Sequence, residues 1–152
     1  MKKLHKVFII IITLSAVAIL FFSLELLKFF SPTNDNYLYI RNEKIQVELA
    51  TTPPQWQAGL SGRKALCQNC GMLFIFPESG VKEFWMKGML IPLDIIWIDD
   101  NKIIGIEKVV PAPEVGQLPA IVRSPAGVNM VLEVNAYQAN NFKIGDRVFL
   151  AK

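Results

Sequence analysis

Short apolar runs and apolar–polar alternation fill the chain from about residue 43 onward, and this pattern predicts β-strands. Ile45, Val47 and Leu49 alternate with polar residues, which is the period of two typical of a half-buried strand. Residues 71–76 and 93–99 are apolar at successive positions, so strands there would be buried on both faces. The other strands that we expect cover residues 82–87, 102–110, 121–124, 128–135 and 146–150.

Two short helices are expected between these strands. Thr52 is placed to cap a helix at residues 53–60, which begins with two prolines. A second helix is expected at residues 136–143, with Gly145 placed to end it. Glycine and proline are frequent throughout this part of the chain, which favours short strands joined by turns over long helices. The pattern therefore predicts a mostly β protein: a single compact β-sandwich or barrel-like domain with one or two short helices.

A different pattern precedes this domain. Residues 7–24 carry no charge and, at ~1.5 Å per residue, are long enough to approach the thickness of a bilayer. Three lysines stand directly before them, which predicts a cytoplasmic N-terminus. The alternative is a cleaved signal peptide and a secreted domain, because Ala16-Val17-Ala18 has the form of a cleavage site. We expect a cytoplasmic flank at 1–6, a single-pass transmembrane signal-anchor helix at 7–30, a linker at 31–42 and an extracytoplasmic β domain at 43–152.

The charge of the chain reflects this topology. The net charge is +3, but residues 32–152 carry twelve Lys and Arg against twelve Asp and Glu. Nucleic-acid binding relies on clustered basic residues, and this part of the sequence has none. We therefore expect no nucleic-acid partner. The expected partners are the membrane, through the N-terminal helix, and outside it an envelope protein or a polar small-molecule or glycan ligand.

The residue types of the common catalytic sites are missing from the domain. His5 is the only histidine and precedes the apolar segment, so a Ser-His-Asp or Cys-His site within the domain is excluded. Two cysteines without a histidine do not complete a zinc site, and no glycine-rich phosphate loop is present. We expect no metal and no cofactor, and the balance is against an enzyme.

Cys67 and Cys70 form the most chemically suggestive short motif. A redox role would require the pair at a helix N-terminus, whereas a strand is expected to follow at residues 71–76. Outside the cytoplasm a structural disulfide is the favoured interpretation. Free thiols or a metal site shared between molecules are the remaining alternatives. A disulfide that closes so small a loop removes little entropy from the unfolded chain, and loss of the disulfide should therefore have little effect on folding.

Lys87, Asp94 and Glu133 are charges within apolar strands, where an unpaired charge is costly. In one interpretation they converge, beside Trp85, in a pocket that binds a polar ligand or performs acid–base chemistry. In the other they form a structural ion-paired set that also satisfies backbone amides, or Asp94 closes a turn or bulge. Tryptophan and tyrosine side chains could stack on sugars or peptides, although aromatic residues in strands more often belong to the core.

An ordered set of short motifs after residue 59 resembles the DUF192 family of small prokaryotic domains. The resemblance covers about residues 43–150 and implies a compact, mostly β domain of sandwich or barrel type, often exported, without an established reaction. Cys67 and Cys70 depart from the family pattern. The matching segments are Gly59-Leu60, Arg63, Leu66, Gly71-Met72-Leu73-Phe74, Phe84-Trp85-Met86-Lys87, Ile91-Pro92-Leu93-Asp94-Ile95, Leu132-Glu133-Val134 and Gly145-Asp146.

Three functional hypotheses follow from these observations. The first is a membrane-anchored, non-catalytic envelope accessory or ligand-binding module. The alternative is a hydrolase that uses Asp94 and Glu133 with electrostatic support from Lys87, and a weaker one is a thiol–disulfide protein that uses Cys67 and Cys70. Asp94 and Glu133 in a shared open cleft would favour the enzyme, whereas an enclosed pair would favour the binding module.

Overall fold

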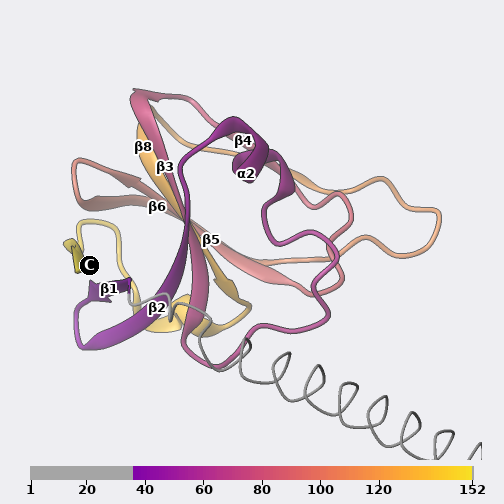
Figure 1. Ribbon diagram of the computed structural model, residues 1–152, viewed down its shortest axis with the longest axis horizontal. Coiled ribbons are helices and arrows are strands. Elements are labelled where there is room, and N and C mark those ends of the chain that lie inside the picture. Colours follow the sequence, from indigo (N-terminus) through magenta and orange to yellow (C-terminus); the bar gives the residue numbers. More distant parts are fainter. Residues whose placement is uncertain (1–35, 152) are drawn as a thin grey trace, which may run out of the picture. The chain divides into compact units, whose positions relative to one another are not determined.

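The computed structural model describes residues 36–151 (Figure 1). Within them, no helix is both long and apolar enough to cross a membrane, and the predicted segments 1–6 and 7–30 lie outside the described residues. The elements in chain order are β1 (Tyr37–Ile40), β2 (Glu43–Ala50), α2 (Pro53–Ala58), β3 (Cys70–Gly80), β4 (Glu83–Trp85), β5 (Leu93–Asp99), β6 (Lys102–Val110), β7 (Ile121–Arg123), β8 (Val128–Asn135), the 3₁₀ helix η1 (Gln138–Asn141) and β9 (Val148–Ala151).

Each strand expected after residue 43 is present, with ends shifted by up to four residues, and three further features differ from the expectation. Residues 37–40, expected within the linker 31–42, form β1 between β2 and β9. The second helix is a single 3₁₀ turn rather than residues 136–143. Strand β4 ends at Trp85, so Lys87 lies in the following turn and not inside a strand. Short elements of this kind depend on partners from distant parts of the chain, which local patterns do not show.

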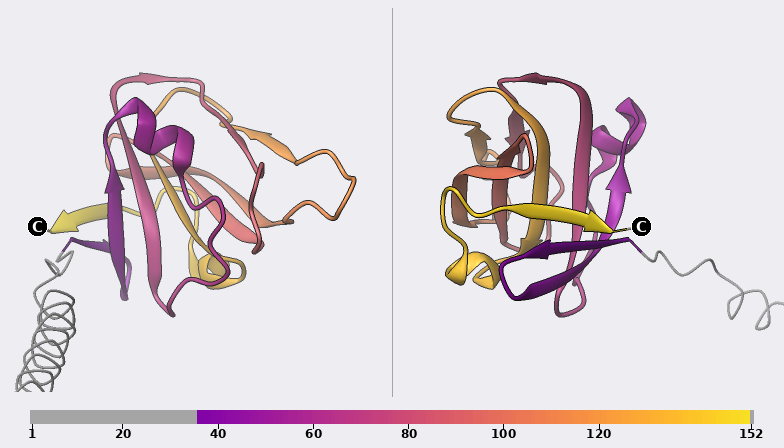
Figure 2. Two further views of the ribbon diagram at one scale, coloured as in Figure 1. Left: turned by 45° about the vertical axis from the view of Figure 1, so that its right-hand side comes forward. Right: turned by 90° about the vertical axis from the view of Figure 1, so that its left-hand side faces the viewer.

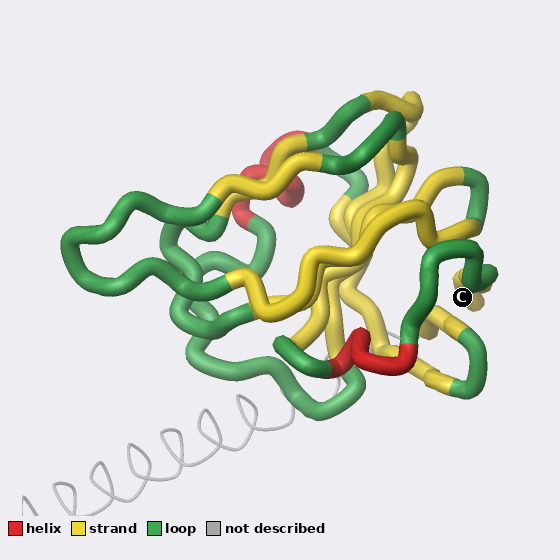
Figure 3. Tube along the Cα trace, turned by 180° about the vertical axis from the view of Figure 1, so that it is seen from behind, coloured by secondary structure: helices red, strands yellow, loops and turns green. Residues whose placement is uncertain are grey.

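The strands form a seven-stranded sheet in the order β6-β5-β8-β3-β2-β1-β9 and a separate two-stranded ribbon of β4 and β7. Neighbouring strands are antiparallel except for β2 and β3. A parallel pair needs a crossover connection, and here residues 51–69 supply it and contain α2. Figure 3 shows α2 and η1 apart, on different sides of the sheet.

The large sheet curls into a half-barrel whose two edge strands approach each other (Figure 2). At the start of β6, the Ile103 N–H donates to the Asp146 carbonyl at 3.0 Å, and the Val148 N–H donates to the Asn101 carbonyl at 2.9 Å. Lys102 and Arg147 form an antiparallel bridge between the same segments. These bonds satisfy edge groups that an open sheet would leave unpaired. The expected mostly β, barrel-like architecture is thereby confirmed at this level.

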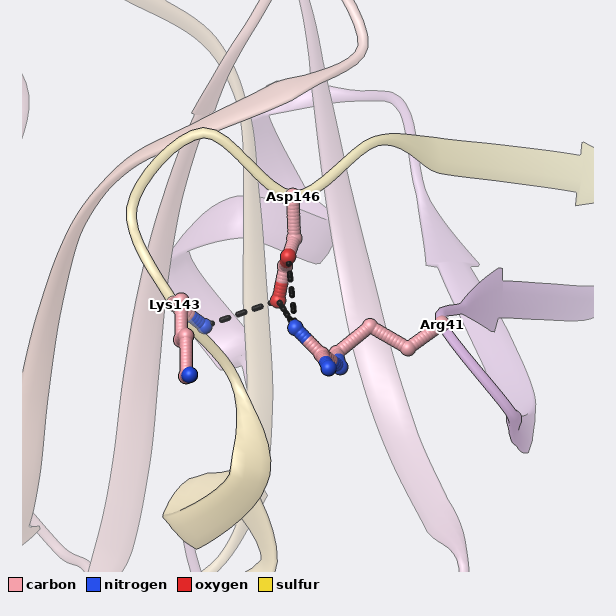
Figure 4. A network of polar contacts seen from close by, with 3 residues as sticks. All are labelled: Arg41, Lys143 and Asp146. Atoms are coloured by element: carbon pink, nitrogen blue, oxygen red, sulfur yellow. Dashed lines mark hydrogen bonds and ion pairs between the residues drawn. The ribbon is translucent and has the colours of Figure 1, made fainter.

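A carboxylate network supports this closure (Figure 4). Asp146 Oδ1 accepts a hydrogen bond from Arg41 Nη1 at 3.1 Å, and its Oδ2 accepts from the Lys143 backbone N–H at 2.8 Å. Arg41 belongs to the β1–β2 turn, whereas Lys143 follows η1. One side chain therefore joins the first hairpin to the segment that leads into β9. The Gly145-Asp146 motif forms a turn, in which Gly145 has a φ of 95° that favours glycine.

Both faces of the sheet are buried, as the continuous apolar strands predicted. The concave interior contains Leu38, Leu73, Ile96 and Leu132 and is closed by Ala139 and Phe142 around η1. The outer face carries a second cluster that includes Phe74, Ile95, Trp97 and Val131. Successive strand residues point to opposite faces, so β5 is buried at each position from Leu93 to Ile98. The second cluster is where the sheet meets α2 and the β4–β7 ribbon.

Gly71 permits the close approach of β3 to β8, and Gly71→Ala should destabilise the domain by about 2–3 kcal/mol. A Cβ atom at this position would lie 2.4 Å from the Glu133 carbonyl oxygen and 2.9 Å from Val134 Cγ1. The matched control is Gly80→Ala at the other end of β3, where the nearest atom is the flexible Lys82 Nζ at 3.7 Å. Urea denaturation of the two variants measures the difference. Equal losses of stability would contradict the proposed steric cause.

Candidate functional site

A cavity of about 160 Å³ lies against the outer face of the sheet. Its walls come from α2 and the turn that follows it, from β3, from β4 and from β8. Most of the inner wall is aromatic, and one carboxyl group interrupts it. The residues that define this site, named the aromatic pocket, are Trp56, Phe74, Phe76, Phe84, Trp85 and Glu133.

Local sequence positions the α2 wall. Gln55 Oε1 accepts hydrogen bonds from the backbone N–H groups of Thr51 at 2.9 Å and Thr52 at 3.0 Å, which anchors the first turn of the helix. The adjacent Trp56 donates from its indole Nε1 to the Ala50 carbonyl at 2.9 Å. Its ring then lies 4.9 Å from that of Phe76. The indole is therefore held against the end of β2 and forms a fixed side of the pocket.

Phe84 connects the β4–β7 ribbon to the sheet. Its ring makes edge contacts with Phe74 at 4.9 Å and with Trp97 at 5.7 Å between centroids, geometries that aromatic pairs favour. The ribbon itself is held by the Lys82 N–H, which donates to Ser124 Oγ at 2.9 Å, and by the Ser124 N–H, which donates to the Lys82 carbonyl at 2.9 Å. Ring packing thus ties the pocket roof to the sheet, and the bonds between Lys82 and Ser124 hold the two strands of the roof together.

Glu133 is the buried acid of the pocket. The strand register places it between Met72 on β3 and Ile95 on β5, on the outer face of the sheet. The residue is only 6% exposed, and its carboxyl group forms no hydrogen bond or ion pair with residues 36–151. Burial raises the pKa of Glu133 to about 8, because removing the carboxylate from water disfavours its charged form. At neutral pH this side chain is mostly a neutral acid that can donate a hydrogen bond.

Two ammonium groups lie at the rim of the pocket. Lys82 Nζ is 4.4 Å from the Phe76 ring centroid, and Lys87 Nζ is 4.9 Å from that of Trp85. Trp85 is 52% exposed, so it forms the outer lip. Glu83 also lines the pocket and pairs with Arg123 at 3.7 Å, but both side chains are largely exposed and such a pair contributes little stability.

Asp94 lies on the opposite face from Glu133, and the expectation that Lys87, Asp94 and Glu133 converge is wrong. Asp94 Oδ1 accepts from the Val109 N–H at 2.8 Å, and Oδ2 accepts from the Ala139 N–H at 2.8 Å. Val109 has a φ of 54° and lies where the β5–β6 register shifts. Of the alternatives, the bulge role of Asp94 agrees with this geometry, because its fully buried carboxyl group accepts from one amide at the bulge and one at η1. Only Lys87 and Glu133 of the three line the aromatic pocket.

The cysteine pair lies outside the pocket, immediately before β3. Cys67 and Cys70 are joined as a disulfide with their Cα atoms 5.3 Å apart, and Asn135 Nδ2 donates to the Cys67 carbonyl at 3.0 Å. A strand follows, so the helix dipole that activates redox cysteines is absent at this pair. Their redox state in the native compartment stays a prediction, which alkylation without reductant followed by mass spectrometry would decide. Within the described residues no group of three or more His, Cys, Asp or Glu could hold a metal ion.

Sequence reasoning named Trp85, Lys87 and Glu133 but missed three phenylalanines of the pocket. Phe74, Phe76 and Phe84 were expected only as strand residues, because their convergence depends on the pairing of distant segments. One signal could have found part of the lining. The motifs around residues 59–60, 71–74, 84–87 and 132–134, which carry the family resemblance, all contribute to the wall of the cavity.

Comparisons with known proteins agree with the fold. The structure is similar to a crystal structure of a protein of unknown function from Novosphingobium aromaticivorans, with 27% identity, a TM-score of 0.68 and coverage of 74% of this chain and 83% of that one. It is also similar to a protein from Sinorhizobium meliloti described as a “putative transcription regulator”, with 32% identity, a TM-score of 0.68 and coverage of 79% and 97%. No curated protein matches the chain.

The sequence model of one family, DUF192, matches residues 37–150 and is described as “Uncharacterized ACR, COG1430”. This match spans the described domain from β1 to β9, including each segment that lines the aromatic pocket. The chain therefore belongs to the DUF192 family.

Proposed function

We propose that this domain is a non-catalytic binding module that takes one small ligand, or the end of a larger one, into the aromatic pocket. The observation that carries the proposal is Glu133, a buried carboxyl group in a cavity, without a partner among the described side chains. A buried polar group of this kind costs free energy unless something hydrogen-bonds to it. Ligand pockets combine apolar walls with a few polar groups of this type. The polar part of the ligand would satisfy Glu133.

The size of the cavity limits what enters. A volume of about 160 Å³ is below the roughly 300–1,000 Å³ that is typical of small-molecule sites. A headgroup or a side chain would fill it, whereas a whole sugar chain or a folded protein segment would not. Trp85 at the lip would cover the ligand from outside.

The positions of the carboxylates do not support the hydrolase hypothesis. Paired-carboxylate hydrolysis requires two acids that flank one reacting bond. Asp94 faces the interior of the half-barrel, and both of its oxygens accept backbone hydrogen bonds. Glu83 is the second carboxylate of the pocket, and it is an exposed rim residue whose partner is Arg123. These observations favour binding over catalysis.

The location of the module is proposed from the sequence. The uncharged residues 7–24 and the lysines before them support an anchor in the membrane and a domain outside the cytoplasm. The regulatory description of the Sinorhizobium protein is not carried over, because a charge-balanced domain in that location has no access to DNA. Protease added to intact spheroplasts should degrade the domain and spare an N-terminal tag. Complete protection of the domain would overturn the topology.

A screen of small organic ligands against the full-length protein in maltoside micelles tests the binding function. A ligand of the folded state raises the melting temperature by mass action, and Trp85→Ala should weaken its binding at least tenfold. Phe149→Ala is the matched control, because Phe149 is 61% exposed on β9 and does not line the pocket. Equal effects of the two variants, or the absence of any ligand at millimolar concentration, would contradict the proposal.

A further inference from the structure

The inner wall of the aromatic pocket is suited to positive charge. Aromatic faces carry negative electrostatic potential and attract ammonium groups. The protein uses this attraction at the rim, where Lys82 Nζ and Lys87 Nζ each lie within 5 Å of a ring centroid. Deeper in the pocket, Trp56, Phe74 and Phe84 face the cavity together with the Glu133 carboxyl group, and no cation of residues 36–151 is paired with that group.

We propose, on the basis of the binding function above, that the pocket recognises the ammonium group of a small organic cation, with Glu133 as its counter-ion. A ring wall alone would accept an apolar group equally well, and a carboxyl group alone would suit any hydrogen-bond donor. Both features in one small cavity favour a group that is positively charged and has an apolar surface. Alkylated ammonium groups have these two properties.

The rim adds a preference for the rest of the ligand. Lys82 and Lys87 line the same cavity as Glu133, and they flank β4 in the chain. Their charges oppose a bare cation and favour a ligand that carries an anionic group beyond its ammonium group. The expected ligand class is therefore a zwitterion, with its ammonium at Glu133 and its anion near these lysines.

Binding has a defined proton balance. The free pocket holds the neutral acid of Glu133, because burial raises its pKa to about 8. When the cation binds, the carboxyl group loses its proton to the buffer and an ion pair forms. Affinity should therefore increase with pH, by about 50-fold between pH 6 and pH 8 for a pKa near 8. The other ionisable groups on this side are Lys82, Glu83 and Lys87 at the pocket. On the same face of the sheet, the register places Glu107 across from Ile95, and Glu48, paired with Arg63, across from Met72.

Titration calorimetry of the full-length protein in maltoside micelles provides the test, with choline and its neutral isostere 3,3-dimethyl-1-butanol as probes. At pH 8, choline should bind at least tenfold more tightly than the isostere, with proton release detected as a dependence of heat on the buffer. Glu133→Gln keeps the shape of the side chain, and it should abolish the preference for choline, the proton release and the pH dependence. Subtracting the pH dependence of binding by Glu133→Gln from that of wild type removes the contribution of the other titrating groups. Phosphocholine should bind more tightly than choline, and Lys87→Met should remove this gain.

The outcomes separate the two proposals. Equal binding of choline and the neutral isostere, or a preference for choline that survives in Glu133→Gln, would overturn the cation site and leave the binding function intact. Binding of other small ligands in the screen, without binding of choline or phosphocholine, would also overturn the cation site. Failure of every probe and every screened ligand would overturn both proposals.

Discussion

Asp94→Ala should destabilise the domain by about 3–5 kcal/mol, measured as the free energy of unfolding in urea. The carboxylate is fully buried, and its two oxygens accept the Val109 and Ala139 N–H groups, both at 2.8 Å. Alanine would leave both donors without a partner inside the protein and would open a cavity between the β6 bulge and η1. Unsatisfied buried donors are more costly than the bonds they once made, which explains the size of the expected loss.

Two further substitutions test this explanation. Asp94→Asn keeps one carbonyl oxygen and should lose about half as much stability. Asp99→Ala, on the same strand, removes a hydrogen bond from Ser79 Oγ at a partly exposed site and should cost about 1 kcal/mol or less. Lys87 neither pairs with Asp94 nor shares its face, so Lys87→Met and Asp94→Ala should be additive. A coupling above about 1 kcal/mol between them would contradict the placement of Asp94.

Glu133→Gln should make the protein more stable at neutral and alkaline pH. The pKa of Glu133 is about 8 in the folded protein and near 4.5 in the unfolded chain. Between these values the folded state retains a proton that the unfolded state has lost, so stability falls as pH rises through this window. For wild type, the fall attributable to Glu133 should be roughly 3 kcal/mol between pH 4 and pH 7.

The measurement is the difference between the stability curves of wild type and Glu133→Gln from pH 4 to pH 9. Subtraction removes opposing contributions such as that of Glu48. The Arg63 hydrogen bond lowers the pKa of Glu48, so its contribution is present above the ordinary pKa and is lost as pH falls. Parallel curves would show that Glu133 is ionised in the folded state. If the curves diverge as expected, the domain retains a destabilising acid, which is a common property of functional sites.

Local sequence determined most of the elements because their signals act over a few residues. The alternation at Ile45, Val47 and Leu49 defined β2, and the double proline after Thr52 defined the start of α2. The continuous apolar residues of β5 correctly predicted burial on both faces. Strand β1 escaped this reasoning because only Leu38 and Ile40 are buried and its two neighbours are β2 and the distant β9.

The sequence by itself therefore determined the family and the mostly β fold class, and it named Glu133 and Lys87 as candidate site residues. Only the tertiary structure decided which charges share a site. Within one strand, the sequence shows which residues share a face. Whether Asp94 on β5 shares a face with Glu133 on β8 depends on the register of the two strands, in which Glu133 pairs with Ile95. A shift of one residue would have placed Asp94 beside Glu133 on the same face. The pocket also required the β4–β7 ribbon to fold over β3, which places Phe84 against Phe74. Such contacts join residues far apart in the chain, and their energies depend on packing that no local pattern contains.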